Sequence, residues 1–343
     1  MTTVFTYAPA TGHTRVHHPE NAQRLAELLS SFDRHGLRQQ MAQLPIAPAT
    51  LSQIKRVHTA EYIQYIEGLS LRGGGQLNPD TYLTPESYQL ALHAAGGCIA
   101  VVDAVAGGTA RNGLALVRPP GHHAGTSRGE GFCLFNNIAI AARQAQEAHG
   151  RKRVLILDFD VHHGNGTQDI FYADDRVLFV SLHMMAPYFY PGTGRETETG
   201  RGAGKGYNLN IPFSPGVGDT GYVLALDEIV TPVVRQFGPE MILVSAGFDA
   251  HWQDPLAAAG LSLTGYARIV RRLLALADEF CNGQIVFVLE GGYFREALQT
   301  GLLNLAALLT GQDSIQDPLG PCPRPETDVT QLLSRLHRRY LPA

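Results

Sequence analysis

The sequence has only four cysteines among 343 residues, and none of them are close together. Cys98, Cys133, Cys281 and Cys322 form no Cys-x-x-Cys pair. This spacing argues against a disulfide framework and against a zinc site built from thiolates. A reducing compartment is therefore the better fit.

Long apolar runs are also missing. No stretch approaches the roughly 18 uninterrupted apolar residues of a membrane span, and the first residues, MTTVFTYAPATGHTRVHH, lack a basic region followed by an apolar core. We therefore expect neither a signal peptide nor a membrane segment, and we predict a cytoplasmic protein.

Positive charge is not in excess. The chain carries 27 Lys and Arg against 31 Asp and Glu, a net charge of −4, and no block of five basic residues. This balance disfavours binding to nucleic acid or to an anionic membrane. The 44% hydrophobic content and the 37 glycines indicate a globular chain with a large core. No signal for the oligomeric state is visible.

Apolar runs of strand length alternate with segments of helical periodicity. The expected strands are Leu114–Val117, Val154–Phe159, Val177–Leu182, Tyr207–Ile211, Met241–Ala246 and Ile285–Leu289. The expected helices are Tyr88–Ala106, Asn137–His149, Tyr222–Phe237, Thr264–Phe280 and Arg295–Leu309. The alternation predicts a single α/β domain over residues 1–343, three-layered α/β/α around a mostly parallel sheet, with a closed eight-stranded barrel as the alternative.

Ligands of open parallel sheets bind beyond the carboxyl ends of the strands, so residues that carry chemistry are expected there. The strand at Val154–Phe159 runs into Asp158-Phe159-Asp160-Val161-His162. Because alternate residues of an extended chain share a face, Asp158, Asp160 and His162 point to one side. The strand at Met241–Ala246 is followed by Asp249, a third acid at the same edge.

Asp160, His162 and Asp249 therefore form a candidate metal site. Three protein ligands with a fourth position left open are typical of a catalytic site for zinc or a similar first-row metal. For each residue alone, an ordinary role as a helix cap or a hydrogen-bonded polar group is about as plausible. Asp158 could be a ligand, a partner of a nearby histidine or a buried structural acid.

Two further strand ends supply groups for acid–base chemistry. One carries His122 and His123 within Arg118-Pro119-Pro120-Gly121-His122-His123, and the other carries Tyr293 after Glu290-Gly291-Gly292. Metal-assisted amide hydrolysis needs a base for the water proton and an acid for the leaving amine, and histidine titrates in the right range for both. A phenol could donate to the oxyanion. Taken alone, Tyr293 would be interpreted as an ordinary aromatic residue at a strand end.

Together these segments resemble the arginase/deacetylase superfamily, and within it the bacterial class II-type histone deacetylase-like amidohydrolases. The resemblance begins at His18-Pro19-Glu20-Asn21-Ala22-Gln23-Arg24-Leu25 and covers nearly the whole chain. The matching motifs are Arg118–Ala124 (RPPGHHA), Gly131–Asn137 (GFCLFNN), Asp158–Gly166 (DFDVHHGNG), Ser245–Asp249 (SAGFD) and Glu290–Tyr293 (EGGY). Five ordered motifs are far more specific than any one of them.

The resemblance implies a zinc-dependent hydrolase that removes acetyl or other acyl groups from lysine side chains through water activated by the metal. It implies one zinc ion held by Asp160, His162 and Asp249, with His123 as base and acid, His122 assisting beside Asp158, and Tyr293 polarising the acyl carbonyl. It further implies a channel lined by the Gly131 carbonyl, Phe132 and Tyr190, with Asp80 anchoring the substrate at the rim. A potassium ion is implied near Asp158, Asp160, His162, Ser181 and Leu182.

Three positions differ among members of this family: Asn165 gives His123 a neutral partner, and Tyr190 and Leu256 bear on substrate choice. Asn165 stands where class I relatives carry Asp, and Tyr190 stands where the second channel aromatic is usually Phe. Leu256 occupies the place where polyamine-selective relatives carry a Glu gatekeeper, which ranks acyl-lysine above acetylpolyamine.

Three other functions remain to be weighed: an amidohydrolase for acetylpolyamines or other small amides, a two-metal ureohydrolase, and a degenerate acyl-lysine binding module. A two-metal site would need further bridging carboxylates, whereas the chain offers His163 and Asn165 beside His162. A degenerate module would have lost Tyr293 or the histidine pair, and the sequence retains them.

Overall fold

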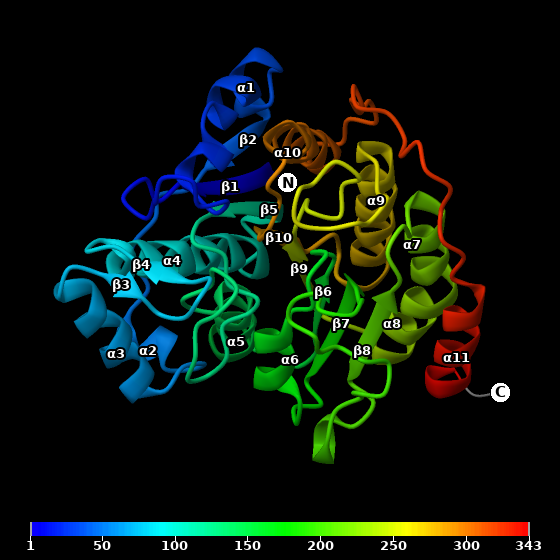
Figure 1. The fold of residues 1–343 in the computed structure, drawn as a ribbon, viewed down its shortest axis with the longest axis horizontal. Coiled ribbons are helices and arrows are strands. Elements are labelled where there is room, and N and C mark those ends of the chain that lie inside the picture. Colours follow the sequence, from blue (N-terminus) through cyan, green and yellow to red (C-terminus); the bar gives the residue numbers. More distant parts are fainter. Residues whose placement is uncertain (1, 342–343) are drawn as a thin grey trace.

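The computed structural model describes residues 2–341 (Figure 1), so residues 1, 342 and 343 of the predicted domain lie outside the described part. Its centre is an eight-stranded sheet in the order β2-β1-β5-β10-β9-β6-β7-β8, with every pairing parallel. The strands are β1 (Thr2–Ala8), β2 (Met41–Gln43), β5 (Ala110–Val117), β6 (Val154–Asp158), β7 (Val177–Met184), β8 (Asn208–Phe213), β9 (Met241–Ala246) and β10 (Ile285–Leu289). The sheet is open, with β2 and β8 at its edges, so the barrel alternative is wrong.

The middle strands are buried on both faces. Every residue of β6, β9 and β10 is buried, which explains why these strands read as continuous apolar runs rather than as alternating patterns. Their register brings the carboxyl ends level, because Asp158 pairs with Ser245 on β9 and with Ser181 on β7. The loops that follow these strands therefore start side by side.

Helices cover both faces of the sheet, as the three-layer prediction requires. Leu155 and Leu157 face one apolar cluster, which includes side chains of α1, α7, α9, α10 and α11. Val154 and Ile156 face the other, which includes side chains of α3, α4 and α5. The helices are α1 (Leu28–Arg34), α2 (Leu51–Ile54), α3 (Ala60–Leu71), α4 (Ser87–Ala106), α5 (Asn137–His149), α6 (Asn165–Phe171), α7 (Asp219–Ala225), α8 (Thr231–Phe237), α9 (Leu263–Phe280), α10 (Arg295–Leu309) and α11 (Thr330–Tyr340). A two-stranded hairpin, β3 (Gly75–Gln76) with β4 (Tyr82–Leu83), lies outside the main sheet.

Helix α4 is the one helix of the described chain that is long and apolar enough to cross a membrane. Its position in the fold explains that composition. It packs against β1, β5 and α5, and 67% of its most apolar window is buried inside the protein. Most of its apolar surface is therefore covered by the core.

Most of the expected elements are confirmed, and the departures have local causes. The helix expected over Tyr222–Phe237 begins at Asp219 and is interrupted by a π-helical turn, Leu226–Val230, just before Pro232 of α8. Proline lacks the N–H of a helical hydrogen bond, so the turn before it relaxes. Strands β1 and β2 were not predicted, because β1 has no clear period and β2 has only three residues.

A candidate metal centre and catalytic pocket

Four loops that follow adjacent strands build the site. The sheet order places β5, β10, β9 and β6 next to one another, so the loops after them meet at one edge. The loop after β5 carries the histidine pair, the loop after β10 carries Tyr293, and the loops after β9 and β6 carry the candidate metal ligands. The strand-end rule thus explains how residues 170 positions apart can come together.

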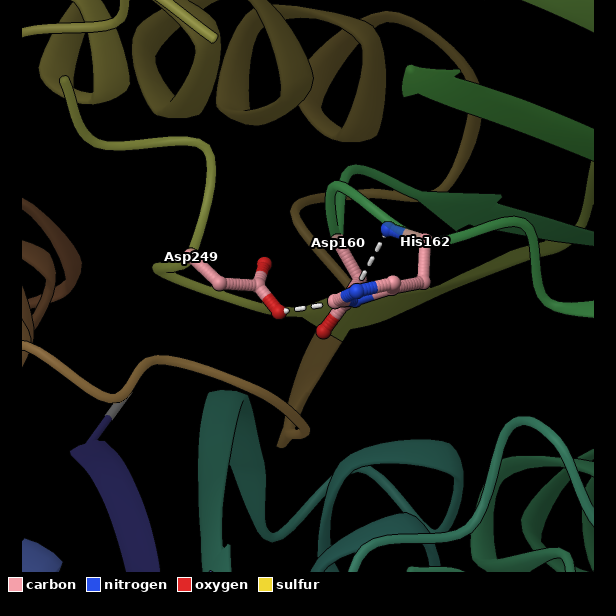
Figure 2. A group of neighbouring side chains, drawn as sticks. All are labelled: Asp160, His162 and Asp249. Carbon is pink, nitrogen blue, oxygen red and sulfur yellow. Dashed lines mark hydrogen bonds and ion pairs between the residues drawn. The ribbon is translucent and has the colours of Figure 1, made fainter. Parts of the chain in front are cut away.

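Figure 2 shows the predicted metal ligands Asp160, His162 and Asp249 facing one another. Their potential ligand atoms all lie within 4.8 Å of one another. Nδ1 of His162 is 3.2 Å from Oδ1 of Asp160 and 3.2 Å from Oδ2 of Asp249. The three side chains predicted from sequence spacing therefore converge on one point.

Backbone donors hold the two carboxylates in place. The N–H of Gly291 donates to Oδ2 of Asp160 at 2.8 Å, and the N–H of Val161 donates to Oδ1 of Asp249 at 2.9 Å. A Cβ atom on Gly291 would lie 2.2 Å from Oδ2 of Asp249, so only glycine permits this approach. Each acid keeps an oxygen directed toward His162.

The electrostatics of this cluster fit a divalent cation. Burial and the charge of Asp160 raise the pKa of Asp249 to about 7. Burial of His162 disfavours its charged form, but the carboxylates of Asp160 and Asp249 outweigh this effect and raise its pKa to about 10. Two buried acids so close together must either take up a proton or be balanced by a positive charge. A proton on His162 supplies one, and a metal ion competes for the same nitrogen lone pair. The donor set of two carboxylates and one imidazole suits zinc.

The histidine pair lies directly beside these acids. Nδ1 of His122 is 2.9 Å from Oδ2 of Asp158, and its Nε2 is 3.9 Å from Oδ1 of Asp160. Nδ1 of His123 is 2.8 Å from Oδ1 of Asn165. Each ring therefore carries a proton on Nδ1, and neither Nε2 atom takes part in these two hydrogen bonds. The predicted pairing of His122 with Asp158 is present in the structure.

The surroundings separate the pKa values of the two histidines. Burial disfavours the charged form of His122, but the charges of Asp158, Asp160 and Glu290 outweigh it and raise the pKa to about 10. Burial and the neighbouring His122 hold the pKa of His123 well below its usual value. At neutral pH His122 is cationic and His123 is neutral, which makes His123 the available base.

Tyr293 is placed by two residues that we did not predict. Oδ2 of Asp254 accepts hydrogen bonds from the N–H groups of Tyr293 at 2.7 Å and Phe294 at 3.0 Å. The guanidinium of Arg24 lies 5.0 Å from the centre of the Tyr293 ring and donates to the carbonyl of Gly292 at 2.8 Å. Burial raises the pKa of Tyr293 although Arg24 opposes it, so the phenol keeps its proton.

A pocket of about 320 Å³ leads to this group of side chains. All five predicted substrate-contact residues line it, namely Asp80, Gly131, Phe132, Tyr190 and Leu256. His122, His123, His162 and Tyr293 also lie in its wall, together with Pro120, Tyr188, Phe189 and Gly291. The pocket therefore joins the predicted channel to the predicted catalytic groups.

The walls of the pocket are largely aromatic. Phe132 takes a left-handed backbone conformation with φ of +69°, and its ring meets that of Tyr293 edge-on at 5.8 Å between centroids. Phe189, which we did not single out, stacks on His162 at 5.0 Å and 7° between planes. Tyr190 lies edge-on to His123 at 5.0 Å, and its buried hydroxyl has no hydrogen-bond partner within residues 2–341.

Asp80 lies in the pocket wall, but its carboxylate is also engaged inside the protein. Oδ1 accepts hydrogen bonds from the N–H of Gly131 at 3.2 Å and from Oγ1 of Thr81 at 2.6 Å. These contacts fix the Gly131–Phe132 turn. The role as a substrate anchor at the rim stays a prediction.

The residues predicted to bind potassium are close neighbours. Asp158 pairs with Ser181 across β6 and β7, and Leu182 follows on the same strand. The hydroxyl of Ser181 lies 2.9 Å from Nδ1 of His183, and Oδ1 of Asp158 accepts from the N–H of Asp160 at 3.1 Å. Potassium binding itself stays a prediction.

Glu290 is a further residue that the sequence reasoning missed as part of the site. Its buried carboxylate accepts hydrogen bonds from the N–H groups of Gly121 at 2.7 Å and His122 at 3.2 Å, and burial raises its pKa to about 7. Its place directly after a buried strand was the available signal. The carboxylate fixes the backbone from which both histidines project.

The chain is similar to known proteins over most of its length. The family model described as "Histone deacetylase domain" matches residues 18–309. A protein of Archaeoglobus fulgidus named "Probable deacetylase" is 42% identical over 321 residues, which cover 93% of this chain and 87% of that protein. The "Histone deacetylase-like amidohydrolase" of Pseudomonas aeruginosa is 40% identical, covering 90% of this chain and 80% of its own.

A solved structure described as "Crystal Structure of HDA15 HD domain" superimposes with a TM-score of 0.91 at 35% sequence identity. The alignment covers 99% of this chain and 94% of that one. The likeness therefore extends over the whole sheet and both helical layers.

Proposed function

This chain belongs to the histone deacetylase family, and from that premise we propose that it is a zinc-dependent deacetylase that acts on acyl-lysine side chains of proteins or peptides. The family and its relatives support the coarser statement, a deacetylase or amidohydrolase. The observation that carries the finer proposal is the convergence of Asp160, His162 and Asp249 beside a neutral His123 at a pocket with aromatic walls.

Zinc, when held by Asp160, His162 and Asp249, would supply Lewis-acid activation of water and of the acyl carbonyl. The chain's own groups do the rest. Nδ1 of His123 is hydrogen-bonded to Asn165, so Nε2 is the nitrogen that accepts the proton that water loses as it attacks the carbonyl carbon. The same nitrogen returns this proton to the lysine nitrogen as the C–N bond breaks. The products are a free amine and a carboxylate.

Tyr293 and His122 stabilise the charge that develops. The raised pKa of Tyr293 keeps its hydroxyl protonated, so the hydroxyl is a donor for the oxyanion of the tetrahedral intermediate. Asp158 and Asp160 lie beside His122 and raise its pKa, which favours a cationic ring next to the reacting group. Hydrogen bonds to Asp254 and Asp158 hold Tyr293 and His122 in place before the substrate arrives.

The pocket walls favour a lysine side chain over a polyamine. Phe132 and Phe189 offer apolar surface to a neutral acyl group and to the methylene stem of lysine. Leu256 contributes a further apolar contact where a second ammonium group would need a carboxylate. The cytoplasmic location expected from the sequence remains part of this proposal.

The test is a substrate panel with the purified protein. We expect release of acetate from an acetyl-lysine peptide, slower release from acetylpolyamines, and complete loss of both after chelation with recovery on adding zinc. A preference for acetylpolyamine would move the substrate assignment to small amines. Retention of full activity after exhaustive chelation would contradict the zinc proposal.

A further inference from the structure

A continuous chain of polar contacts links His123 to the protein surface. Nδ1 of His123 is 2.8 Å from Oδ1 of Asn165, and Nδ2 of Asn165 donates to Oε1 of Glu130 at 2.8 Å. Nε of Arg128 donates to the same Glu130 oxygen at 2.8 Å, and Nη2 of Arg128 donates to Oδ2 of Asp169 at 2.6 Å. Sequence reasoning assigned no role to Glu130 or Arg128.

Glu130 decides which way the Asn165 amide faces. An ionised carboxylate only accepts hydrogen bonds, so the NH₂ group of the amide must point toward Glu130 and its oxygen must point toward His123. The amide oxygen also only accepts, so the facing Nδ1 of His123 must carry the proton. The lone pair then resides on Nε2, the nitrogen that the proposed reaction uses.

The backbone of Asn165 has little freedom of its own. The N–H of Thr167 donates to the carbonyl of His122 at 3.1 Å, and a Cβ atom on Gly166 would lie 2.4 Å from the carbonyl oxygen of Ala124. The turn after Asn165 is thus pressed against the loop that carries the histidines. Rotation of the amide about its last side-chain bond is the remaining motion, and that bond has two nearly equal orientations when no partner chooses between them.

We propose that Glu130 is a positioning residue for catalysis, because it locks the Asn165 amide in the orientation that keeps the proton of His123 on Nδ1. The inference rests on the proposed hydrolase function for its kinetic consequence, but the orientation itself does not. Without Glu130, the reversed amide would present NH₂ to His123 and favour the tautomer that has no lone pair on Nε2.

The same contacts explain why an amide suits position 165 in this chain. An aspartate there would set two carboxylates at hydrogen-bond distance from each other, and one of them would have to take a proton or turn away. Replacing Glu130 by glutamine removes that conflict, since the glutamine amide could donate to an aspartate at 165. The aspartate's other oxygen could then accept from His123. The effect of Asn165→Asp should therefore depend on residue 130: the substitution is unfavourable beside glutamate and compatible with glutamine.

The exposed end of this series of hydrogen bonds contributes less to holding Asn165 in place. The side chains of Arg128 and Asp169 are 44% and 48% exposed, and ion pairs of that kind contribute little. Asp169→Ala is therefore a matched control, because it removes the far partner of Arg128 without touching Glu130 or Asn165.

The test measures kcat and KM for Glu130→Ala, Glu130→Gln, Asn165→Asp and the double variant Glu130→Gln/Asn165→Asp. We expect kcat of Glu130→Ala to fall about ten-fold or more with KM nearly unchanged, because the base is mispositioned while the pocket is intact. Glu130→Gln, which retains an acceptor oxygen, should stay within about three-fold of the parent. Asn165→Asp should lose at least about ten-fold alone and recover most of it in the double variant.

A second readout separates this inference from the proposed function. The tautomer of His123, read from long-range ¹H–¹⁵N correlations and assigned with His123→Ala, should be Nδ1–H in the parent and mainly Nε2–H in Glu130→Ala. This measurement holds even if no tested amide is a substrate. An unchanged tautomer and full kcat in Glu130→Ala, or equal losses for Asn165→Asp in both backgrounds, would overturn the inference.

Discussion

The carboxylate of Asp254 accepts a 2.7 Å hydrogen bond from the backbone N–H of Tyr293. It ties the loop after β9, which carries Asp249, to the loop after β10, which carries the phenol. The other oxygen of Asp254 accepts from the N–H of Leu256 at 3.0 Å, so one buried acid also fixes a residue of the pocket wall. The distance between the metal site and the Tyr293 hydroxyl therefore depends on Asp254.

Removing Asp254 should reduce catalysis more than substrate binding. In Asp254→Ala the N–H groups of Tyr293, Phe294 and Leu256 lose their acceptor, and Tyr293 can drift from the oxyanion position. We expect kcat to fall about ten- to hundred-fold with smaller changes in KM. Asp254→Asn keeps one acceptor oxygen, so its kcat should lie between those of the parent and of Asp254→Ala. An unchanged kcat in Asp254→Ala with a normal melting temperature would exclude this role.

Loss of one candidate ligand should abolish metal binding. Asp249→Asn and His162→Ala each leave only two ligands, so we expect metal analysis to find about one zinc per parent chain and almost none in the variants. Chelation should lower the melting temperature of the parent, since the buried acids lose their compensating charge, and should hardly affect Asp249→Asn. Asp169→Ala, an exposed acid, is the control. Stoichiometric zinc in both ligand variants would rule out this site.

Tyr293 and Tyr190 should respond differently to loss of their hydroxyls. Tyr293→Phe removes the proposed oxyanion donor, and we expect kcat to fall at least about a hundred-fold while zinc content is unchanged. Tyr190→Phe removes a buried hydroxyl without a partner in the described chain, so folding stability should be kept or rise slightly. Its effect on kcat should stay within about three-fold for acetyl-lysine. Equal losses in the two variants would contradict the assignment of the donor to Tyr293.

The sequence was sufficient to predict the sheet centre and the convergence of the candidate site residues, because both follow from short local patterns. β9 and β10 begin and end where the apolar runs Met241–Ala246 and Ile285–Leu289 do, since strands buried on both faces need apolar residues throughout. The strand-end rule then brought Asp160, His162 and Asp249 to one edge. Their distances could not be predicted, because they depend on the register of β6 against β9.

What the sequence did not reveal are the residues that act through another residue. Asp254, Glu290 and Glu130 are acids in loops, a class that is usually solvated, and nothing in their spacing says which N–H group they accept from. Phe189 was missed because its neighbour Tyr190 had been assigned to the second aromatic position of the channel, and the stacking of Phe189 on His162 depends on the path of a long loop. Such contacts arise from tertiary packing, which local sequence patterns do not specify.

Acid should remove a contribution to stability that comes from Glu20. This buried carboxylate pairs with Arg118 and lies 3.2 Å from Arg24, and although burial opposes ionisation, these partners lower its pKa from 4.5 to about 2. A lowered pKa in the folded state means that the contribution, about 3 kcal/mol, is complete above pH 4.5 and is lost as the pH falls toward 2.

The measurement is urea unfolding of the parent and of Glu20→Gln between pH 7 and pH 3. The difference in unfolding free energy should be largest at neutral pH and shrink below pH 4.5, because the variant leaves two arginines without their charged partner only where the parent is ionised. Glu228→Gln, at an exposed position, should follow the parent. A constant difference across this range would show that Glu20 contributes through packing rather than charge.

Substitution of Leu256 should change the preference between lysine and polyamine substrates. It lies in the pocket wall with its backbone fixed by Asp254, so a glutamate at this position would project a carboxylate over the pocket without moving the loop. Leu256→Glu should raise kcat/KM for an acetylpolyamine relative to an acetyl-lysine peptide by about ten-fold, because the new charge attracts a second ammonium group. The gain should shrink at high salt, where such attraction is screened. Leu256→Gln, which has nearly the same shape without the charge, should show no shift. An equal shift in Leu256→Gln would mean that shape rather than charge selects the substrate.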